Sequence, residues 1–581
     1  MDASLDRNRA AMMPPSRRDS LLTASLWLLP VTYLAVFYFF PLSSILTISF
    51  SRLDGDIIPL IKTLVSPTNL SIVGFTFYQA ALSTILTLAL GLPGAYLLAR
   101  YQFRGKSLLQ ALMGIPFVMP TLVVGAAFNA LLGSRGWINL GIMQLFNLSE
   151  PPIQFTNTLL AILVAHVFYN TTIVLRMVGD FWSHLDPRLD QAARVLGASR
   201  WQAFSRISLP LLLPAIVSAA LLVFIFDFTS FGVILVLGGP RFATLEVEIY
   251  TQTISLFNLP LAGMLALLQL ACTLTMTVVY SRLASRLTIP LSLRPHTYTQ
   301  RKLHSFQSRV FTLIMVSLLI TLLTLPLAAL ALRSITRLEP DRGEHSVDTG
   351  FTLDFYRELS INRRQSIFFA PPATAIGVSL GYATLTAGLS LLLGLPSAVA
   401  LTRNGNSTLN RLLDPLLMMP LGTSAVTLGL GFIVALDQPP LDLRASWLMV
   451  PLAHTLVAYP FVVRSLTPAL RSIRPRLRQA GAVLGASPME VLLKIDLPLV
   501  GRAIIVAATF AFTISLGEFG ATALIARPEY PTIPVAIYRF LSQPGALNYG
   551  QALALSTLLM LLTAVGMLAI ERFRIADVGE F

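Results

Sequence analysis

The sequence predicts an all-α polytopic membrane protein with about twelve transmembrane helices in two parallel six-helix repeats. Three observations predict this fold class. Hydrophobic residues make up 55% of the 581 residues, charged residues only 12%, and the mean hydropathy is +0.71. Apolar segments long enough to cross a bilayer recur along the chain, and the second half of the chain repeats the first. We expect helices because backbone groups in lipid must be satisfied within the segment.

The expected spans divide evenly between the two halves. About twenty apolar residues suffice for one crossing. The first segment is longer than a signal-peptide core and lacks a small-residue cleavage site, so we expect it to remain as a span. The spans lie at roughly 21–49, 72–98, 108–132, 157–180, 209–236 and 260–282, and then at roughly 309–332, 373–402, 412–436, 445–467, 497–525 and 549–571.

The arginine residues predict the orientation of these spans. Cytoplasmic loops of membrane proteins carry an excess of Lys and Arg. Here the N-terminal segment and the loops after even-numbered spans are rich in arginine, whereas Arg135 and Arg444 are the only cations in two of the short opposite loops. Both termini are therefore predicted to be cytoplasmic. The loop after the fourth span alone contains Arg188, Arg194, Arg200 and Arg206.

The net charge of +14 does not indicate a nucleic-acid partner, because no basic patch is interleaved with exposed aromatic residues. The arginine-rich loops of a membrane protein account for it instead, with the lipid bilayer as the partner. Cys272 is the single cysteine, so neither an intrachain disulfide nor a thiolate metal site is expected.

The two halves align without a gap over a long stretch. His166 aligns with His454, and Pro210 aligns with Pro498. Both halves contain an even number of spans, so they run in the same direction through the membrane. We therefore expect a first repeat at 1–282, a cytoplasmic linker at 283–308 and a second repeat at 309–581.

One polar loop is repeated most closely. The sequence PRLDQAARVLGAS at 187–199 returns as PRLRQAGAVLGAS at 475–487. The pattern predicts a helix, a glycine turn at Gly197 or Gly485, and a second helix that begins with a Ser-x-x-Gln or Ser-x-x-Glu capping box. One helical face is predicted to be apolar and small at its centre. This face consists of Leu189, Ala192, Ala193 and Leu196 in the first copy, and of Leu477, Ala480, Gly481 and Leu484 in the second.

Two partners could receive such a face. A short amphipathic helix with basic borders could lie on the lipid surface. It could also enter a groove on another protein. Alanine and glycine bury little area in a bilayer but allow another protein to approach closely, so we favour a protein partner. Two copies of the loop then imply two partner subunits.

The loop resembles the EAA motif of binding-protein-dependent ABC importer permeases, in which E-A-A is followed by G and then by I-x-L-P. The residues that match are Gln191, Ala192, Ala193, Gly197, Ile207, Leu209 and Pro210 in the first loop (near 183–210), and Gln479, Ala480, Gly481, Gly485, Ile495, Leu497 and Pro498 in the second (near 471–498). Glutamine stands at both positions where the family usually has glutamate.

The resemblance implies a chain of two fused permease domains in the bacterial cytoplasmic (inner) membrane. It implies that the loops are coupling helices held by two ABC ATPase subunits, and that a periplasmic or extracellular substrate-binding protein delivers the substrate. Gly105-Lys106-Ser107 ends like a phosphate-binding loop, but Arg100 stands at the position of its first glycine. We therefore expect no catalytic site and no cofactor in this chain, with ATP used by the partner subunits.

Two substrates fit fused permeases of this kind. The segments 237–250 and 264–269 resemble the thiamine type most, and the ferric iron type is the alternative. A secondary transporter is a more distant alternative, because it gives no reason for the duplicated loops.

Charged and ionisable residues in the spans are the candidates for the translocation path, because charge at bilayer depth is costly. They are Asp227, Glu518, His166 and His454. The alternative for these four residues is hydrogen bonding between helices. The two histidines lie in separate halves and do not predict a metal site from their spacing.

Overall fold

The protein is described by a computed structural model, which covers residues 17–50, 62, 65–287, 300–303, 305–338, 350–361, 371–403, 408–437 and 441–574. Within these residues nine helices are long and apolar enough to cross a membrane, or twelve if each of three bent helix pairs counts as one span. The only strands described are two short pairs. β1 (Tyr101–Gln102) runs parallel to β2 (Arg301–Lys302), and β3 (Thr336–Arg337) runs antiparallel to β4 (Gly350–Phe351).

The first half contains the helices of the first predicted repeat. They are α1 (Arg17–Leu34), η1 (Ala35–Phe39), α2 (Phe40–Phe50), α4 (Pro67–Arg100), α5 (Lys106–Val118), α6 (Thr121–Leu132), α7 (Trp137–Phe146), α8 (Leu159–His184), α9 (Arg188–Val195), α10 (Arg200–Ala203), η2 (Phe204–Ser208), α11 (Leu209–Phe228), α12 (Gly232–Leu237), η3 (Pro240–Phe242), α13 (Leu245–Ile254) and α14 (Leu259–Leu287). Helix α14 continues past 282, and residues 288–299 of the expected linker lie outside the described residues.

The second half repeats the order of the long helices, without a counterpart of α7 and with α16 and η5 added. It contains α15 (Phe306–Ser334), α16 (Asp354–Arg357), η5 (Glu358–Ser360), α17 (Pro372–Arg403), α18 (Thr408–Met418), η6 (Met419–Gly422), α19 (Ala425–Ala435), α20 (Met449–Ser472), α21 (Pro475–Val483), α22 (Pro488–Val491), η7 (Leu492–Asp496), α23 (Leu497–Leu499), α24 (Gly501–Gly517), α25 (Gly520–Ile525), α26 (Ile533–Leu541) and α27 (Ala546–Arg574).

Four of the predicted spans are not single helices. The segments expected at 108–132 and 412–436 bend by 110° and 97°. In the first bend Pro120, which cannot continue a helix, precedes α6. In the second bend Ser424 caps the start of α19. The span expected at 209–236 ends at Phe228, and α12 begins only at Gly232. The span expected at 497–525 breaks after Gly517 in the same way.

The first span of each half packs against the other half. Helix α1 contacts α17, and the Trp27 indole N–H donates to Asn410 Oδ1 of α18 at 3.1 Å. In return α15 packs against α6, and the Trp137 indole N–H donates to the Ala329 carbonyl at 3.2 Å. The two sequence repeats are therefore interlocked in space rather than separate bodies.

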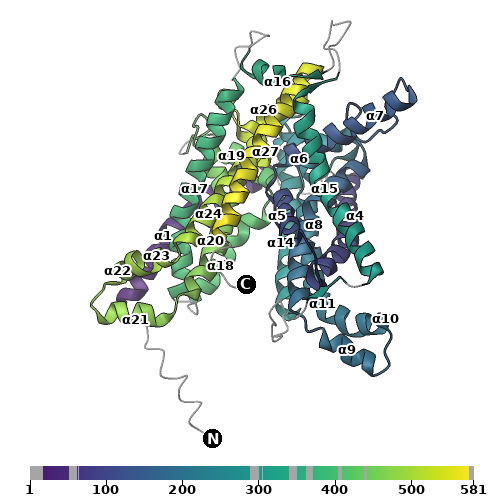
Figure 1. Cartoon of the computed structure of the whole chain (residues 1–581). Coiled ribbons are helices and arrows are strands. Elements are labelled where there is room, and N and C mark those ends of the chain that lie inside the picture. The colour runs from purple at the N-terminus through teal and green to yellow at the C-terminus, as the bar shows by residue number, and fades with distance from the viewer. Residues whose placement is uncertain are drawn as a thin grey trace.

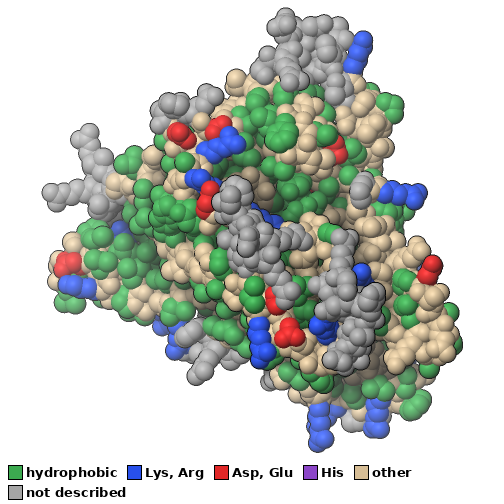
Figure 2. Space-filling model, turned by 90° about the horizontal axis from the view of Figure 1, so that it is seen from above, with side chains coloured by type: hydrophobic (Ala, Val, Ile, Leu, Met, Phe, Trp, Pro, Cys, Tyr) green, Lys and Arg blue, Asp and Glu red, His purple; other side chains and the backbone are tan. Residues whose placement is uncertain are grey.

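The two ends of the molecule are formed by different helices (Figure 1). Helices α9 and α10 lie at the lower end of Figure 1, and α21 and α22 lie at the same end on the opposite side. Helices α7, α16 and α26 lie at the other end. Figure 2 looks onto that second end, where acidic and basic side chains are dispersed among hydrophobic ones.

Candidate functional site: two coupling loops and a cavity between the halves

The repeated loop forms the predicted helix–glycine–helix in both halves. Helix α9 is followed by Gly197 at φ +94°, and α21 is followed by Gly485 at φ +84°. This left-handed backbone favours glycine because a Cβ atom would strain it. The second helices begin with complete capping boxes at Ser199 and Ser487, as the sequence predicted. We call 187–203 and 475–491 the two coupling loops, after the role that their resemblance to the EAA motif implies.

The exposed apolar surface of these loops lies at their tips rather than at the centre of the predicted face. Leu196 and Leu484 are each 88% exposed. Their neighbours Val195 and Val483, which the sequence analysis did not single out, are equally exposed. Of the other predicted residues, Leu189, Gln191, Ala192, Gly197, Leu477, Gln479, Ala480 and Gly485 are exposed, and Ala193 is half-buried.

Gly481 differs from the expectation. It is buried against its own loop, since a Cβ atom added to it would lie 2.8 Å from the Ile495 side chain and 3.4 Å from Val491. Its small size therefore lets the two helices of the loop approach each other. The spacing of residues alone could not distinguish packing within the loop from contact with a partner protein, because both need a small residue at the same position.

Each coupling loop is tied to the span that follows it. In the first half Ser208 donates a hydrogen bond to Asp190 Oδ1 at 2.8 Å. In the second half Arg478 Nε donates to Asp496 Oδ1 at 2.8 Å. Asp190 aligns with Arg478, and Ser208 aligns with Asp496, so the same two positions are joined in both halves. Each loop is thereby held against the residues that lead into its span, and in the second half a bend of 74° separates these residues from α24.

A cavity of about 400 Å³ lies between the halves. It is lined from the first half by α6, α8, α11 and α12, and from the second half by α19, α20, α24 and α25. Six aromatic residues contribute to the wall: Tyr169, Phe226, Phe231, Phe461, Phe510 and Phe519. Its only acidic residues are Asp227 and Glu518, and it is lined by no lysine or arginine of the described residues.

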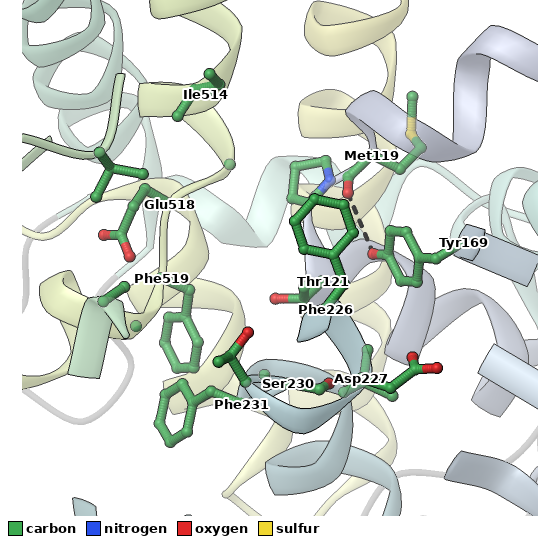
Figure 3. A pocket seen from close by; sticks show the side chains of 18 of the residues that line it. Met119, Thr121, Tyr169, Phe226, Asp227, Ser230, Phe231, Ile514, Glu518 and Phe519 are labelled. Atoms are coloured by element: carbon green, nitrogen blue, oxygen red, sulfur yellow. Dashed lines mark hydrogen bonds between the residues drawn. The ribbon is translucent and has the colours of Figure 1, made fainter. Parts of the chain in front are cut away.

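All four candidate path residues reach this region, but as two separate pairs. His166, Asp227 and Glu518 line the cavity, and His454 lies behind Glu518. His166 Nδ1 lies 3.3 Å from Asp227 Oδ1, and His454 Nε2 lies 3.1 Å from Glu518 Oε2. Figure 3 shows the Asp227 and Glu518 carboxylates on opposite sides of the cavity. These contacts join helices within each half, as the hydrogen-bonding alternative expected.

Further polar partners surround each pair, and the sequence analysis did not identify them. Asn170 Nδ2 donates to Asp227 Oδ1 at 2.6 Å, and Ser83 Oγ lies 3.0 Å from His166 Nδ1. Glu518 accepts from the backbone N–H groups of Ala521 and Thr522 and from the Thr522 hydroxyl. Ser83 is distant in sequence from His166, and Asn170 from Asp227, so spacing carried no signal for these contacts, whereas Ala521 and Thr522 lie within four residues of Glu518.

An aromatic stack between the two halves forms part of the cavity wall. Phe231 and Phe519 stand at equivalent positions and stack with ring centroids 5.5 Å apart and an interplanar angle of 19°. Each ring also contacts a tyrosine of the following helix: Phe231 contacts Tyr250, and Phe519 contacts Tyr538. Because α11 and α24 run from the coupling loops toward these rings, the stack lies farther along these spans from the loops than the cavity residues of α11 and α24 do.

Glu246 makes a polar contact between the two halves. It lies on α13, between the membrane spans, and is 1% exposed. It accepts hydrogen bonds from Gln269 of its own half and from Ser424 of the other half. Burial raises the pKa of Glu246 to about 8, although the bonds from Ser424 and Gln269 act in the opposite direction. Pro534 stands at the equivalent position of the second half, so this contact has no counterpart.

Duplicated helix–glycine–helix loops at one end, interlocked helical halves and a cavity between them define a polytopic transport permease. The family described as "Binding-protein-dependent transport system inner membrane component" matches residues 91–289 and again 390–574. These matches cover more than half of the chain. The chain belongs to this family, as the resemblance of its loops predicted, and it is a multi-pass inner membrane protein.

Individual relatives match nearly the whole chain. The thiamine transport system permease protein of Escherichia coli (strain K12) is 26% identical over 505 residues, which is 85% of this chain and 88% of the relative. The protein of the same name from Brucella abortus (strain 2308) is 28% identical over 513 residues, or 87% and 86% of the two chains. The sulfate transport system permease protein of Escherichia coli (strain K12) is 33% identical over 213 residues, or 36% of this chain and 75% of the relative.

Proposed function

We propose that this chain is the complete translocation unit of an ATP-driven importer for thiamine or a closely related organic cation. The observation that carries this proposal is the pair of coupling loops. They lie at one end of the molecule on opposite sides, and both present exposed leucine and valine side chains at their tips (Figure 1). Two docking surfaces of the same shape suit two ATPase subunits, one for each half.

The loops also suit a partner that moves. Each tip is joined to its span by the Asp190–Ser208 or the Arg478–Asp496 contact, so closure of an ATPase pair would draw both spans together. In this proposal ATP is bound and hydrolysed only by those subunits, and the chain itself is not an enzyme and holds no cofactor. The arginine-rich loops and both termini then face the cytoplasm, with 1–282 and 309–581 as the two permease repeats and 283–308 as their linker.

The cavity supports an organic cation as the substrate. Thiamine carries a positive thiazolium ring and a pyrimidine ring, and aromatic side chains attract such cations through the faces of their rings. The six aromatic residues of the wall and the two acidic residues beside it offer this chemistry. A ferric ion would instead need several free oxygen ligands. Glu518 already accepts three hydrogen bonds from residues of α25, the helix that follows it. Ferric iron therefore remains the alternative substrate, and no feature of the cavity favours it.

A reconstituted transport assay tests this proposal. The chain would be assembled in liposomes with its ATPase subunits and its periplasmic binding protein, and the uptake of thiamine and of ferric iron would be measured with and without ATP. We expect ATP-dependent uptake of thiamine only. Uptake of iron would identify the alternative substrate. Failure to form a complex with the ATPase, together with uptake that follows an ion gradient, would identify a secondary transporter.

A further inference from the structure

Two histidines at equivalent positions each hold a broken span. His166 of α8 contacts Asp227 in the last turn of α11 and, through Nε2 at 2.9 Å, Ser230 in the break before α12. His454 of α20 contacts Ser515 in α24 through Nδ1 at 2.7 Å, and Glu518 in the break before α25. Each imidazole therefore joins the end of one helix to the residue at which its backbone changes direction.

The two groups contain the same chemistry in the opposite order. Asp227 aligns with Ser515, and Ser230 aligns with Glu518. In the first half the carboxylate precedes the break and the hydroxyl lies in it, whereas in the second half the hydroxyl precedes the break and the carboxylate lies in it. Both histidines thus have one acidic partner and one hydroxyl partner at these two aligned positions, and His454 also contacts the Thr522 hydroxyl through Nε2 at 2.7 Å. The second span of each half adds a hydroxyl at matching positions, Ser83 and Thr386, but Ser83 contacts His166 directly, whereas Thr386 accepts from Ser515.

The breaks matter because the stacked phenylalanines follow them directly. Phe231 comes after Ser230, and Phe519 comes after Glu518. A helix end has backbone groups without intrahelical partners, so side-chain bonds decide the direction in which the chain leaves it. Glu518 shows this directly, because its carboxylate accepts from the first backbone N–H groups of α25. The direction of each break sets the position of its ring in the stack.

We propose that His166 and His454 are positioning residues that fix the two breaks and thereby keep the Phe231–Phe519 stack closed over the cavity. Each histidine needs one carboxylate and one hydroxyl from the broken span, and the order of these two partners is interchangeable. Loss of the carboxylate partner frees the break, tilts its ring and opens the cavity toward the membrane side opposite the coupling loops.

Thiol labelling tests this proposal without any substrate, so its result does not depend on the proposed transport of thiamine. Cys272 is the single cysteine and is replaced by alanine. Thr121 lines the cavity and is replaced by cysteine as the reporter. A membrane-impermeant maleimide is added to the side opposite the coupling loops, on the full chain in vesicles, and the labelling rate is measured.

We expect slow labelling in the reporter background. Asp227→Ser should raise the rate about tenfold, because the buried His166 side chain loses its carboxyl partner. The double variant Asp227→Ser/Ser230→Glu gives the first half the order found in the second, and it should return the rate to within about threefold of the background. The reciprocal pair, Glu518→Ser and Glu518→Ser/Ser515→Asp, should behave in the same way.

Controls keep the result interpretable. Glu246→Gln changes an equally buried acid that contacts neither histidine, and it should leave the labelling rate unchanged. Ser230→Ala is a milder variant, which should raise the labelling rate about threefold. It takes the place of Asp227→Ser if that variant does not fold. Unchanged labelling in the folded single variants would overturn the positioning role. Double variants that fold yet label as fast as the single variants would overturn the interchangeable order.

Discussion

The two coupling loops share one backbone but are tied to their spans by different chemistry. In the first half the tie joins a carboxylate to the neutral Ser208 hydroxyl, whereas in the second half it joins the Arg478 guanidinium to Asp496. The carboxylate stands on the loop in one case and on the span in the other. The same exchange occurs around His166 and His454. The duplicated fold therefore requires a bond between these two positions, but either position can carry the charge.

The largest effect on ATPase binding is expected from a charged residue at the tips, which are alike in both loops. We expect Leu196→Asp and Leu484→Asp each to weaken ATPase binding at least about a hundredfold, because each would bury an unpaired carboxylate in the interface. Binding of the purified ATPase to the chain in nanodiscs measures this. Leu145→Asp, an exposed leucine of α7 at the other end, is the matched control. Equal binding by all three variants would disprove docking at the tips.

A second prediction concerns Glu246, which only the first half possesses. Its folded pKa of about 8 lies above the ordinary value of 4.5. The folded protein therefore binds more protons than the unfolded chain between these two values, and its stability must fall as the pH rises from about 5 to about 8. We expect the thermal midpoint to fall over this range and Glu246→Gln to reduce the fall. An equal fall in both proteins would show that Glu246 does not titrate there.

The two ties should differ in strength when one partner is removed. Arg478→Ala leaves Asp496, which is 1% exposed, as a buried charge without its ion pair, at a cost of about 3 kcal/mol. Asp190→Ala leaves the buried Ser208 hydroxyl without its acceptor, at a cost of about 1 kcal/mol, and also removes a carboxylate that interacts with the buried Arg100. Denaturation of the two variants in the same detergent compares them. If Asp190→Ala proves as harmful as Arg478→Ala, the charge of the tie does not matter.

The smallest effect is expected at the glutamines of the loops. Gln191 and Gln479 are both exposed, and they stand where related permeases usually have glutamate. Restoring the acid in either loop should change the affinity for the ATPase by less than about threefold, since exposed charges contribute little. Titration of Gln191→Glu and Gln479→Glu against the ATPase measures this. A change of tenfold or more in one loop alone would show that the partner distinguishes the two halves.

Local signals in the sequence predicted the local structure well. The Ser199 and Ser487 capping boxes, and the helix ends at Gly197 and Gly485, follow from residues within one turn of one another. The family also followed from these loops. The breaks at 229–231 and 518–519 were not predicted, because the flanking residues are as apolar as a continuous span. The contacts of His166 and His454 depend on how helices distant in sequence pack, which hydropathy does not encode.

The exchange of first spans has a consequence for biosynthesis. Trp27 and its hydrogen-bond partner Asn410 are 383 residues apart in the chain. At ribosomal rates of about 5–20 residues per second, α1 waits roughly 20–80 s in the membrane before its partner α17 has been made. During this interval the Trp27 indole N–H has no native acceptor, and the first half has an uncovered flank where α15 will later lie. Because the halves are fused, each uncovered surface and the helix that will cover it belong to the same chain, which favours their pairing over pairing with a neighbouring molecule.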